Sequence, residues 1–311
     1  MSLGVVDTNA KVGFVGAGRM GSQMILRLVK AGYDVAVYNR TRSKLDSLVA
    51  EGAKAADTVA ELADREVVFI SVASSDDFLE VTLGSNGILS QDTVPKVIVD
   101  VTTVSTESSQ RVRDVATERG SALLACPVSG NPRVAAAGKL TMAVSGPHEA
   151  FQFVEPLLNA IGAGSTYVGE GELARLVKLC HNLFLGVVTQ SMAEVTTLAE
   201  KGGVSREIFL EYLNKSVMGS MFSRYKVPAF VNLDFHPTFT SKLLRKDFDL
   251  GLSEARALEV PMPVAGLVHQ LVQSLIGEGF GDEDFATLLL LQARSAGMKL
   301  ESERSDVTDG L

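Results

Sequence analysis

The sequence predicts an α/β fold, with a doubly wound parallel sheet in the N-terminal part and helices alone in the C-terminal part. Short, nearly continuous apolar segments alternate with amphipathic segments as far as residue 169. Strands that are apolar throughout are typical of a sheet covered on both faces, and their alternation with helices is typical of a parallel sheet. After Glu172 the strand pattern ends, so we expect a second, all-helical domain.

The expected elements follow this alternation. Strands are expected over 11–16, 34–38, 66–72, 96–100, 121–125, 140–145 and 165–168. Helices are expected over 19–31, 42–51, 57–63, 105–119, 148–161, 172–201, 205–214, 240–259, 263–277 and 282–297, and a loop over 126–138. The boundary is placed after Gly171, which gives domains 1–171 and 172–311. The polar tail 301–311 is expected to be disordered.

The long helix expected over 172–201 has an unusual middle, LFLGVV (183–188), which is apolar nearly all round. A helix without a polar face is buried on every side in a stable protein. It would therefore lie between two domains or in a subunit interface. A homodimer or homotetramer is expected.

The composition excludes several classes of protein. The 311 residues are 46% hydrophobic and 21% charged, with a net charge of −8, which is ordinary for a globular protein with two cores. There is no basic block for nucleic acid, no apolar run long enough for a membrane span and no secretory signal pattern. Cys126, Cys180 and four scattered histidines show neither a disulfide framework nor metal-ligand spacing. We expect a cytoplasmic, metal-free protein.

A glycine-rich turn, GAGRMG (16–21), follows the first expected strand and opens the first expected helix. In a βαβ unit this G-x-G-x-x-G pattern binds a dinucleotide, because its glycines allow a tight turn, a close approach to the pyrophosphate and close helix packing. The positive end of the helix dipole then faces the phosphates. A Rossmann domain is therefore expected. Its contacts in this turn would be Gly16, Ala17, Gly18, Arg19 and Met20.

The end of the second strand indicates which dinucleotide is bound. An acidic residue about 20 residues after the glycines binds the ribose of NAD, whereas an arginine accommodates the 2′-phosphate of NADP. Here Asn39, Arg40 and Thr41 follow the strand, without a carboxylate. These side chains favour NADP(H). Alternatively, Arg40 and Arg42 are only the solvated start of the next helix.

Other candidate contacts follow the carboxyl ends of later strands, where the cofactor lies in this architecture. Val72 and Ala73 follow one such strand, and Thr102 and Thr103 follow the next.

The segment PVSGN (127–131) also follows a strand. Ser129, Gly130 and Asn131 can present a hydroxyl and successive backbone N–H groups as an anion site, which suits a substrate carboxylate. Alternatively, this is a turn between prolines that binds nothing.

Lys178 and Asn182 lie four residues apart on the long helix and therefore share one face. A lysine within such an apolar helix is costly unless it is paired or used. Burial lowers the pKa of a lysine toward neutrality, which suits a general acid or base. Alternatively, Lys178 reaches water near the start of the helix. His181, between them, is more simply a packed or exposed side chain, and the charges of LLRKDFDL (243–250) are typical of a solvated helix face.

Together these motifs have a family context. The chain resembles the β-hydroxyacid dehydrogenase family, which includes 3-hydroxyisobutyrate dehydrogenases, tartronate semialdehyde reductases and glyoxylate/succinic semialdehyde reductases. The resemblance spans nearly the whole chain and rests on four ordered motifs, GFVGAGRMG (13–21), PVSGN (127–131), GEGELARLVKLCHN (169–182) and KDFDLGL (246–252). It implies an N-terminal Rossmann domain, a long interdomain helix and an all-helical C-terminal domain.

The resemblance also implies roles for single residues. Lys178 would be the catalytic lysine, and Lys246 would lie beside the nicotinamide. Substrate contacts would come from Ser129, Gly130, Asn182, Thr103, Met221 and Phe222, with Asn131 as a further candidate. Two positions depart from the family pattern: Asn131 replaces the last glycine of PVSGG, and Thr102 replaces the serine of D-x-S-T. Both would lie at the pocket, so they leave the substrate open.

The sequence therefore predicts an NADP(H)-dependent oxidoreductase that acts on a small 3-hydroxy acid or a carboxylated semialdehyde, with Lys178 as general acid and base. One alternative is an imine reductase, or a reductase of larger uncharged carbonyls, on the same fold. Imine reductases usually carry Asp or Tyr at the Lys178 position. A non-catalytic NADP-binding protein is the other alternative, against which the presence of Lys178, Asn182 and Lys246 argues.

Overall fold

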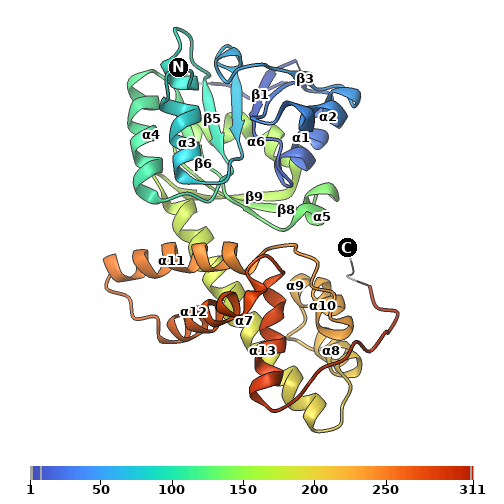
Figure 1. Cartoon of the computed structure of the whole chain (residues 1–311). Helices are drawn as coiled ribbons and strands as arrows, with labels where there is room; N and C mark the ends of the chain where they lie inside the picture. Colours follow the sequence, from blue (N-terminus) through green and yellow to red (C-terminus); the bar gives the residue numbers. More distant parts are fainter. Residues whose placement is uncertain (1–2, 8, 309, 311) are drawn as a thin grey trace. The chain divides into compact units, whose positions relative to one another are not determined.

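The structure is a computed structural model of the chain and describes residues 3–7, 9–308 and 310. It divides into two compact units, residues 1–178 and 179–311. The first unit is α/β and the second is helical (Figure 1). This confirms the predicted fold class. The division falls inside one long helix, so the domain boundary after Gly171 stays a prediction.

One nine-stranded sheet runs through the described part of the first unit, in the order β3-β2-β1-β4-β5-β6-β8-β7, with β9 beside β8. The strands are β1 (Lys11–Val15), β2 (Asp34–Tyr38), β3 (Lys54–Ala55), β4 (Val67–Ile70), β5 (Val97–Asp100), β6 (Ala122–Ala125), β7 (Val128–Ser129), β8 (Leu140–Ser145) and β9 (Gly162–Gly169). Strands β1 to β6 are parallel, and β8 is antiparallel to β6. The order 3-2-1-4-5-6 is that of a dinucleotide-binding fold, whose ligand lies where the strand order reverses, here beside β1 and β4.

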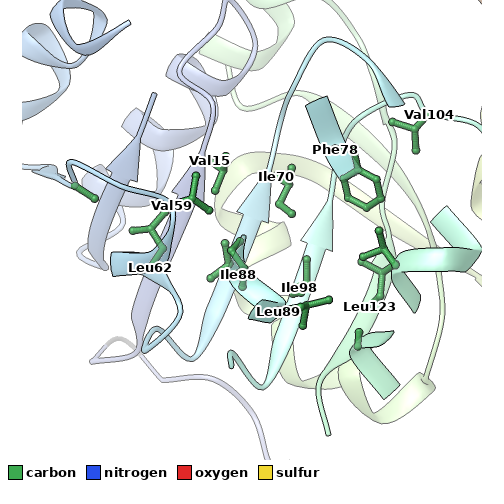
Figure 2. Close-up of a cluster of buried hydrophobic side chains, with 14 of the residues drawn as sticks. Val15, Val59, Leu62, Ile70, Phe78, Ile88, Leu89, Ile98, Val104 and Leu123 are labelled. Carbon is green, nitrogen blue, oxygen red and sulfur yellow. The ribbon is translucent and has the colours of Figure 1, made fainter. Parts of the chain in front are cut away.

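Helices cover both faces of this sheet. They are α1 (Gly21–Lys30), α2 (Asp46–Ala50), α3 (Ser75–Leu83), α4 (Thr106–Glu118), α5 (Pro132–Ala136) and α6 (His148–Ile161). On one face, alternate strand residues such as Val15, Ile70 and Ile98 belong to one buried cluster that also contains Phe78 of α3 (Figure 2). On the other face, the rings of Phe14 and Phe69 stack with centroids 5.6 Å apart. Burial on both faces fixes the strands, and so aligns their carboxyl ends along one edge.

Several segments of the first unit differ from the expected elements, among them β3, which was not expected. The helix expected over 57–63 is only a 3₁₀ turn over Ala60–Leu62. Helix α3 was not expected, although Ser74 caps its start. The loop expected over 126–138 contains β7 and α5, because Asn131 caps α5 and Pro132 occupies its first turn.

The helices of the second unit pack around two apolar clusters. They are α7 (Leu173–Lys201), which begins in the first unit, α8 (Arg206–Lys215), α9 (Met221–Tyr225), α10 (Val227–Asn232), α11 (Ser241–Ala257), α12 (Pro263–Leu275) and α13 (Leu288–Ser295). Helices α9 and α10 were not expected, and the helix expected over 282–297 is a 3₁₀ turn followed by the shorter α13. Among the described residues, no helix combines the length and the apolar character needed to cross a membrane.

Helix α7 is not buried on every side within this chain, as its apolar middle had suggested. Leu183 and Met192 are buried, whereas Phe184 and Leu198 are 69% and 73% exposed. The helix therefore has one face in the core and one apolar face directed outward.

The C-terminal segment also differs from expectation, because residues 301–307 are held by hydrogen bonds. The carboxylate of Glu303 accepts from the backbone N–H groups of Arg206, at 2.7 Å, and Glu207, at 3.0 Å, and so caps α8. The buried Arg206 guanidinium donates to the carbonyls of Phe230 and Glu301. A polar side chain of the segment that was expected to be disordered thus binds the free N–H groups at the start of α8.

Candidate active site

The glycines of the glycine-rich turn differ in whether packing within the protein explains them. Gly16 has a φ of +98°, and a Cβ at this position would lie 2.1 Å from the carbonyl oxygen of Ser71. A Cβ at Gly21 would lie 2.1 Å from the carbonyl oxygen of Gly16. A Cβ at Gly18 would meet none of the described atoms within 4 Å. Protein packing therefore explains the first and third glycines, and the open space at the second fits a pyrophosphate.

The start of α1 is suited to an anion. In the described structure this helix begins without a side-chain cap and has no acidic residue in its first turn, so its positive dipole end is not neutralised by the protein. The Asn39 side chain braces the preceding turn, because its oxygen accepts from the Ala17 N–H at 2.9 Å. Its nitrogen donates to the Thr41 carbonyl at 2.8 Å. The sequence-predicted Asn39 and Ala17 are thus brought together.

Arg40 lies at the end of β2 with 86% of its side chain exposed, and its Nη1 is 3.4 Å from Asp77 Oδ1. Arg42 lies 3.5 Å from Asp57 in a second exposed pair. Exposed ion pairs of this kind contribute little free energy. The pairing with Asp77 therefore does not oppose binding of a phosphate by Arg40.

The ends of β4 and β5 are joined through Thr102. Its hydroxyl donates to the Ile70 carbonyl at 3.3 Å and accepts from the Val72 N–H at 3.1 Å. The Thr102 N–H in turn donates to Asp100 at 3.0 Å. A hydroxyl, rather than serine in particular, is what this position needs, which explains the departure at Thr102. The partly buried Thr103 follows on the same turn.

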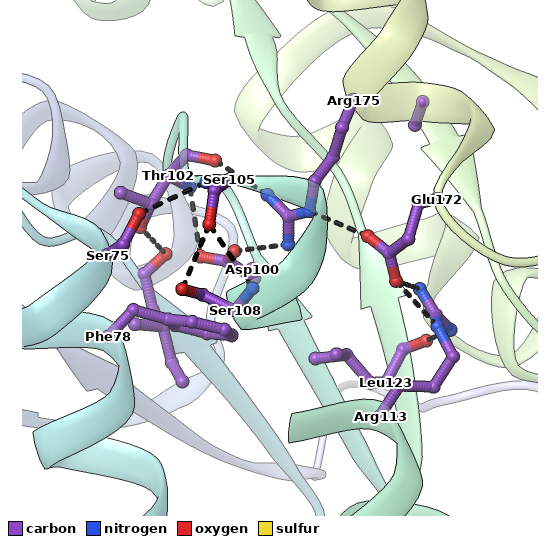
Figure 3. Close-up of polar contacts among 12 residues, drawn as sticks. Ser75, Phe78, Asp100, Thr102, Ser105, Ser108, Arg113, Leu123, Glu172 and Arg175 are labelled. Atoms are coloured by element: carbon purple, nitrogen blue, oxygen red, sulfur yellow. Dashed lines mark hydrogen bonds and ion pairs between the residues drawn. The ribbon is translucent and has the colours of Figure 1, made fainter. Parts of the chain in front are cut away.

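A buried ionic network attaches this turn to the start of α7 (Figure 3). The Arg175 guanidinium donates to Asp100 Oδ2 at 2.6 Å, to the Thr102 carbonyl at 3.1 Å and to Glu172 at 2.8 Å. Glu172 also accepts from Arg113 at 2.7 Å. Burial raises the pKa of the Asp100 carboxyl above its ordinary value, although the Arg175 guanidinium acts in the opposite direction. Sequence reasoning did not identify Arg175.

The PVSGN segment forms β7 and the start of α5. Gly130 has a φ of +134°, and a Cβ there would lie 2.8 Å from Val134 Cγ1. The Asn131 side-chain oxygen accepts from the N–H groups of Arg133, at 2.9 Å, and Val134, at 3.0 Å. The departure at Asn131 therefore provides a helix cap, and packing explains Gly130. The carboxylate site stays a prediction centred on Ser129, which is partly buried.

In the second unit, the Asn182 amide is buried and donates to Asp247 of α11. His181, which is exposed, places Nδ1 2.9 Å from the Asn182 oxygen. Lys246 Nζ is 3.5 Å from the other Asp247 oxygen. The charged segment is therefore not wholly a solvated face. Asp247 was missed, although it falls on the buried helical stripe formed by Leu244, Phe248 and Gly251.

Two glycines set the register of α7 against α11. A Cβ at Gly186 would lie 2.4 Å from the Phe248 ring, and a Cβ at Gly251 would lie 2.9 Å from Leu183. Each helix thus offers a glycine to a large side chain of the other. This reciprocal packing holds Asn182 beside Asp247.

The predicted apolar pair Met221-Phe222 begins α9. Phe222 packs within an aromatic cluster, with its ring centroid 5.3 Å from Tyr225 and 6.3 Å from Phe285. Met221 is 49% exposed. Their contact with a substrate stays a prediction.

The strand order and the glycine-rich turn define a dinucleotide-binding domain. Residues 11–169 match the family described as the NAD binding domain of 6-phosphogluconate dehydrogenase. Residues 172–291 match the family described as NAD-binding of NADP-dependent 3-hydroxyisobutyrate dehydrogenase. The chain belongs to the 3-hydroxyisobutyrate dehydrogenase, or β-hydroxyacid dehydrogenase, family.

Individual relatives agree with this assignment. The chain is 30% identical to 2-(hydroxymethyl)glutarate dehydrogenase of Eubacterium barkeri, over 95% of this chain and 99% of that protein. It is 31% identical to the chloroplastic glyoxylate/succinic semialdehyde reductase 2 of Arabidopsis thaliana, over 89% of this chain and 78% of that protein. The crystal structure of 3-hydroxyisobutyrate dehydrogenase from Salmonella typhimurium is similar with a TM-score of 0.82 and 25% identity, covering 91% of this chain and all of that one.

We predict that Gly186→Ala destabilises the helical unit. The added methyl group would overlap the Phe248 ring, and overpacking of this kind costs about 1–3 kcal/mol. Thermal unfolding should therefore shift to lower temperature. Gly266→Ala in α12 is the matched control, because a Cβ there has open space and alanine raises helix propensity by up to about 1 kcal/mol. Equal melting temperatures for the two variants would contradict the proposed register.

Proposed function

We propose that this protein is an NADP(H)-dependent oxidoreductase that interconverts a small 3-hydroxy acid and the corresponding carboxylated semialdehyde. The observation that carries this proposal is the arrangement on α7. Lys178 and Asn182 share one face of the helix, and the Asn182 amide is fixed by its buried hydrogen bond to Asp247. An oriented amide one turn from a lysine suits a site that positions a hydroxyl and moves its proton.

The roles of the residues follow from this arrangement. When bound, NADP(H) supplies or accepts the hydride. Lys178, as an ammonium, donates a proton to the alkoxide that develops during reduction, and as a neutral amine it removes the hydroxyl proton during oxidation. Asn182 orients the substrate hydroxyl, and Asp247 keeps the Asn182 amide in one orientation. Lys246, whose side chain is 37% exposed, lies beside the nicotinamide in this proposal.

The substrate carboxylate is assigned to Ser129 and the adjacent Gly130. A hydroxyl and backbone N–H groups in a turn with positive φ suit an anion, and Gly130 has a φ of +134°. The names of the relatives support a carboxylated substrate, since glyoxylate, succinic semialdehyde and 2-(hydroxymethyl)glutarate all carry a carboxylate. Thr103, Met221 and Phe222 are further proposed substrate contacts, and Asn131 contributes through the cap of α5.

The preference for NADP(H) rests on the end of β2. Arg40 is exposed beside Asn39 and Thr41, and these side chains can bind a 2′-phosphate, whereas a carboxylate would repel it. The glycine turn holds the pyrophosphate through Gly18 and the start of α1, with Val72 and Ala73 at the end of β4 along the cofactor.

Lys178→Ala is expected to lower kcat by about 100-fold or more, because general acid–base catalysis contributes about 10²–10⁴-fold. The Kd for NADPH should stay unchanged. The measurement is NADPH oxidation with glyoxylate, succinic semialdehyde, an uncharged aldehyde and a cyclic imine, and Lys201→Ala, at the other end of α7, is the control. Near-normal turnover by Lys178→Ala would exclude the lysine as acid and base. Turnover of only the uncharged compounds by the wild-type protein would exclude the carboxylate site.

Arg40→Ala is expected to raise the KM for NADPH by about tenfold, because a hydrogen bond to a charged group contributes about 1.5–3 kcal/mol. The KM for NADH should not change. Arg42→Ala removes a similar exposed charge two residues away and serves as the matched control. Parallel changes for both cofactors, or equal effects of the two variants, would contradict a 2′-phosphate site at Arg40.

A homodimer or homotetramer is also proposed, because the outward face of α7 carries the exposed apolar Leu198. Phe184 and Val195 of the same helix are also exposed, and exposed apolar residues at helical spacing on one face favour an interface. Light scattering after size exclusion should give a multiple of the 33.1 kDa chain mass, and Leu198→Glu should shift the protein toward the monomer. A monomeric wild-type protein would overturn this proposal.

A further inference from the structure

We infer that Arg175 is a positioning residue for catalysis, which holds the turn after β5 and the start of α7 in one fixed arrangement. The inference rests on the proposed function, because it concerns how Lys178 and Thr103 are placed. Arg175 itself is not assigned a contact with substrate or cofactor.

The Arg175 side chain makes hydrogen bonds to three different parts of the first unit. The guanidinium binds the Asp100 carboxylate at the end of β5, the Thr102 carbonyl on the following turn and Glu172 beside the start of α7 (Figure 3). Arg175 is 2% exposed and Asp100 is 0% exposed. The guanidinium carbon also lies 5.9 Å from the centroid of the Phe78 ring, which belongs to the core. The turn and the helix are therefore joined without intervening solvent.

The chemistry of the site requires an arginine. Its planar fork presents donors in several fixed directions, so that one side chain can bind a carboxylate and a carbonyl at the same time. A lysine ammonium is a point charge and lacks this geometry. Removal of Arg175 would leave Asp100 as a buried carboxylate without its cation, which is strongly unfavourable. We expect the turn after β5 to rearrange in response.

The consequence for catalysis follows from the chain. Thr103 comes directly after Thr102, whose carbonyl is held, and Lys178 lies three residues after Arg175 on the same helix. One guanidinium thus sets the backbone that carries both proposed active-site residues. A displacement of about 1 Å at such a site can reduce the rate by about 100-fold.

Arg113 provides a matched control within the same network. It donates to Glu172, to the Leu123 carbonyl and to the Gly171 carbonyl, and its side chain is 12% exposed, compared with 2% for Arg175. Its hydrogen bonds do not involve Asp100 or Thr102. Loss of Arg113 removes a partly buried cation and weakens the fold, but it leaves Arg175 bound to the turn.

The test compares Arg175→Met with Arg113→Met and with Lys178→Ala in the full chain. The substrate is the carboxylated aldehyde, glyoxylate or succinic semialdehyde, that the wild-type protein reduces faster with NADPH. For Arg175→Met we expect kcat to fall by tenfold or more, with the KM for the aldehyde and the Kd for NADPH within about threefold of wild type. For Arg113→Met, kcat should stay within about twofold of wild type. Equal losses of kcat in the two variants, or no loss in either, would overturn the positioning role.

Two further measurements keep the test decisive. The double variant Asp100→Asn/Arg175→Met removes both buried charges, which preserves folding better than removal of one, and it should show the same loss of kcat. Wild-type kcat in the folded double variant would overturn the inference. Amide hydrogen exchange of the segment 101–105 should accelerate in Arg175→Met but not in Arg113→Met, and this readout does not require turnover. If Lys178→Ala keeps its activity, the proposed function fails; if only Arg175→Met keeps it, the positioning role alone fails.

Discussion

The arrangement of the first unit depends on a carboxylate buried away from water at the end of β5. Asp100 is fully buried, and a charge in that position is tolerated only when hydrogen bonds and an opposite charge replace its water. The Arg175 guanidinium and the Thr102 N–H supply these partners. As a result, the contacts that stabilise this carboxylate also join the end of β5, the turn after it and the first turn of α7. The ligand edge of the sheet is therefore rigid where the chemistry is proposed.

In the second unit, close packing of two helices fixes the position of the polar residues. Gly186 and Gly251 allow α7 and α11 to approach so closely that Leu183 and Phe248 fill the space of the missing side chains. Close packing of this kind permits one register only. The polar pair of Asn182 and Asp247 lies at that crossing and is thereby oriented. An isolated buried amide and carboxylate would otherwise have several possible partners.

The sequence predicted features whose signals are local. The glycine-rich turn and the longer strands are encoded by adjacent residues, and they were predicted within a few positions of their observed bounds, whereas the two-residue strands β3 and β7 were not predicted. Arg175 and the tail carboxylate of Glu303 depend on partners far away along the chain, so no window of the sequence contains both halves of either interaction. The cap by Asn131 is local, since its partners are the N–H groups of Arg133 and Val134, but it was not predicted. Arg175 meets Asp100 across 75 positions of the chain. The burial of Asp247 could also have been predicted, because its position falls on a buried helical stripe. It was overlooked because charged residues are usually exposed.

The glycines of the proposed cofactor site and of the proposed substrate site differ in how closely protein atoms surround them. At Gly18 a side chain would meet no described protein atom within 4 Å, whereas at Gly130 it would meet Leu140 and Val134 at 2.7 and 2.8 Å. Packing within the protein accounts for Gly130 but not for Gly18. The motif around Gly130 is therefore a weaker argument for a ligand than its spacing suggests, because a turn that caps α5 would need the same residues. In the proposed function the carboxylate contact therefore depends mainly on the Ser129 hydroxyl, while Lys178 and Asn182 of α7 act on the substrate hydroxyl.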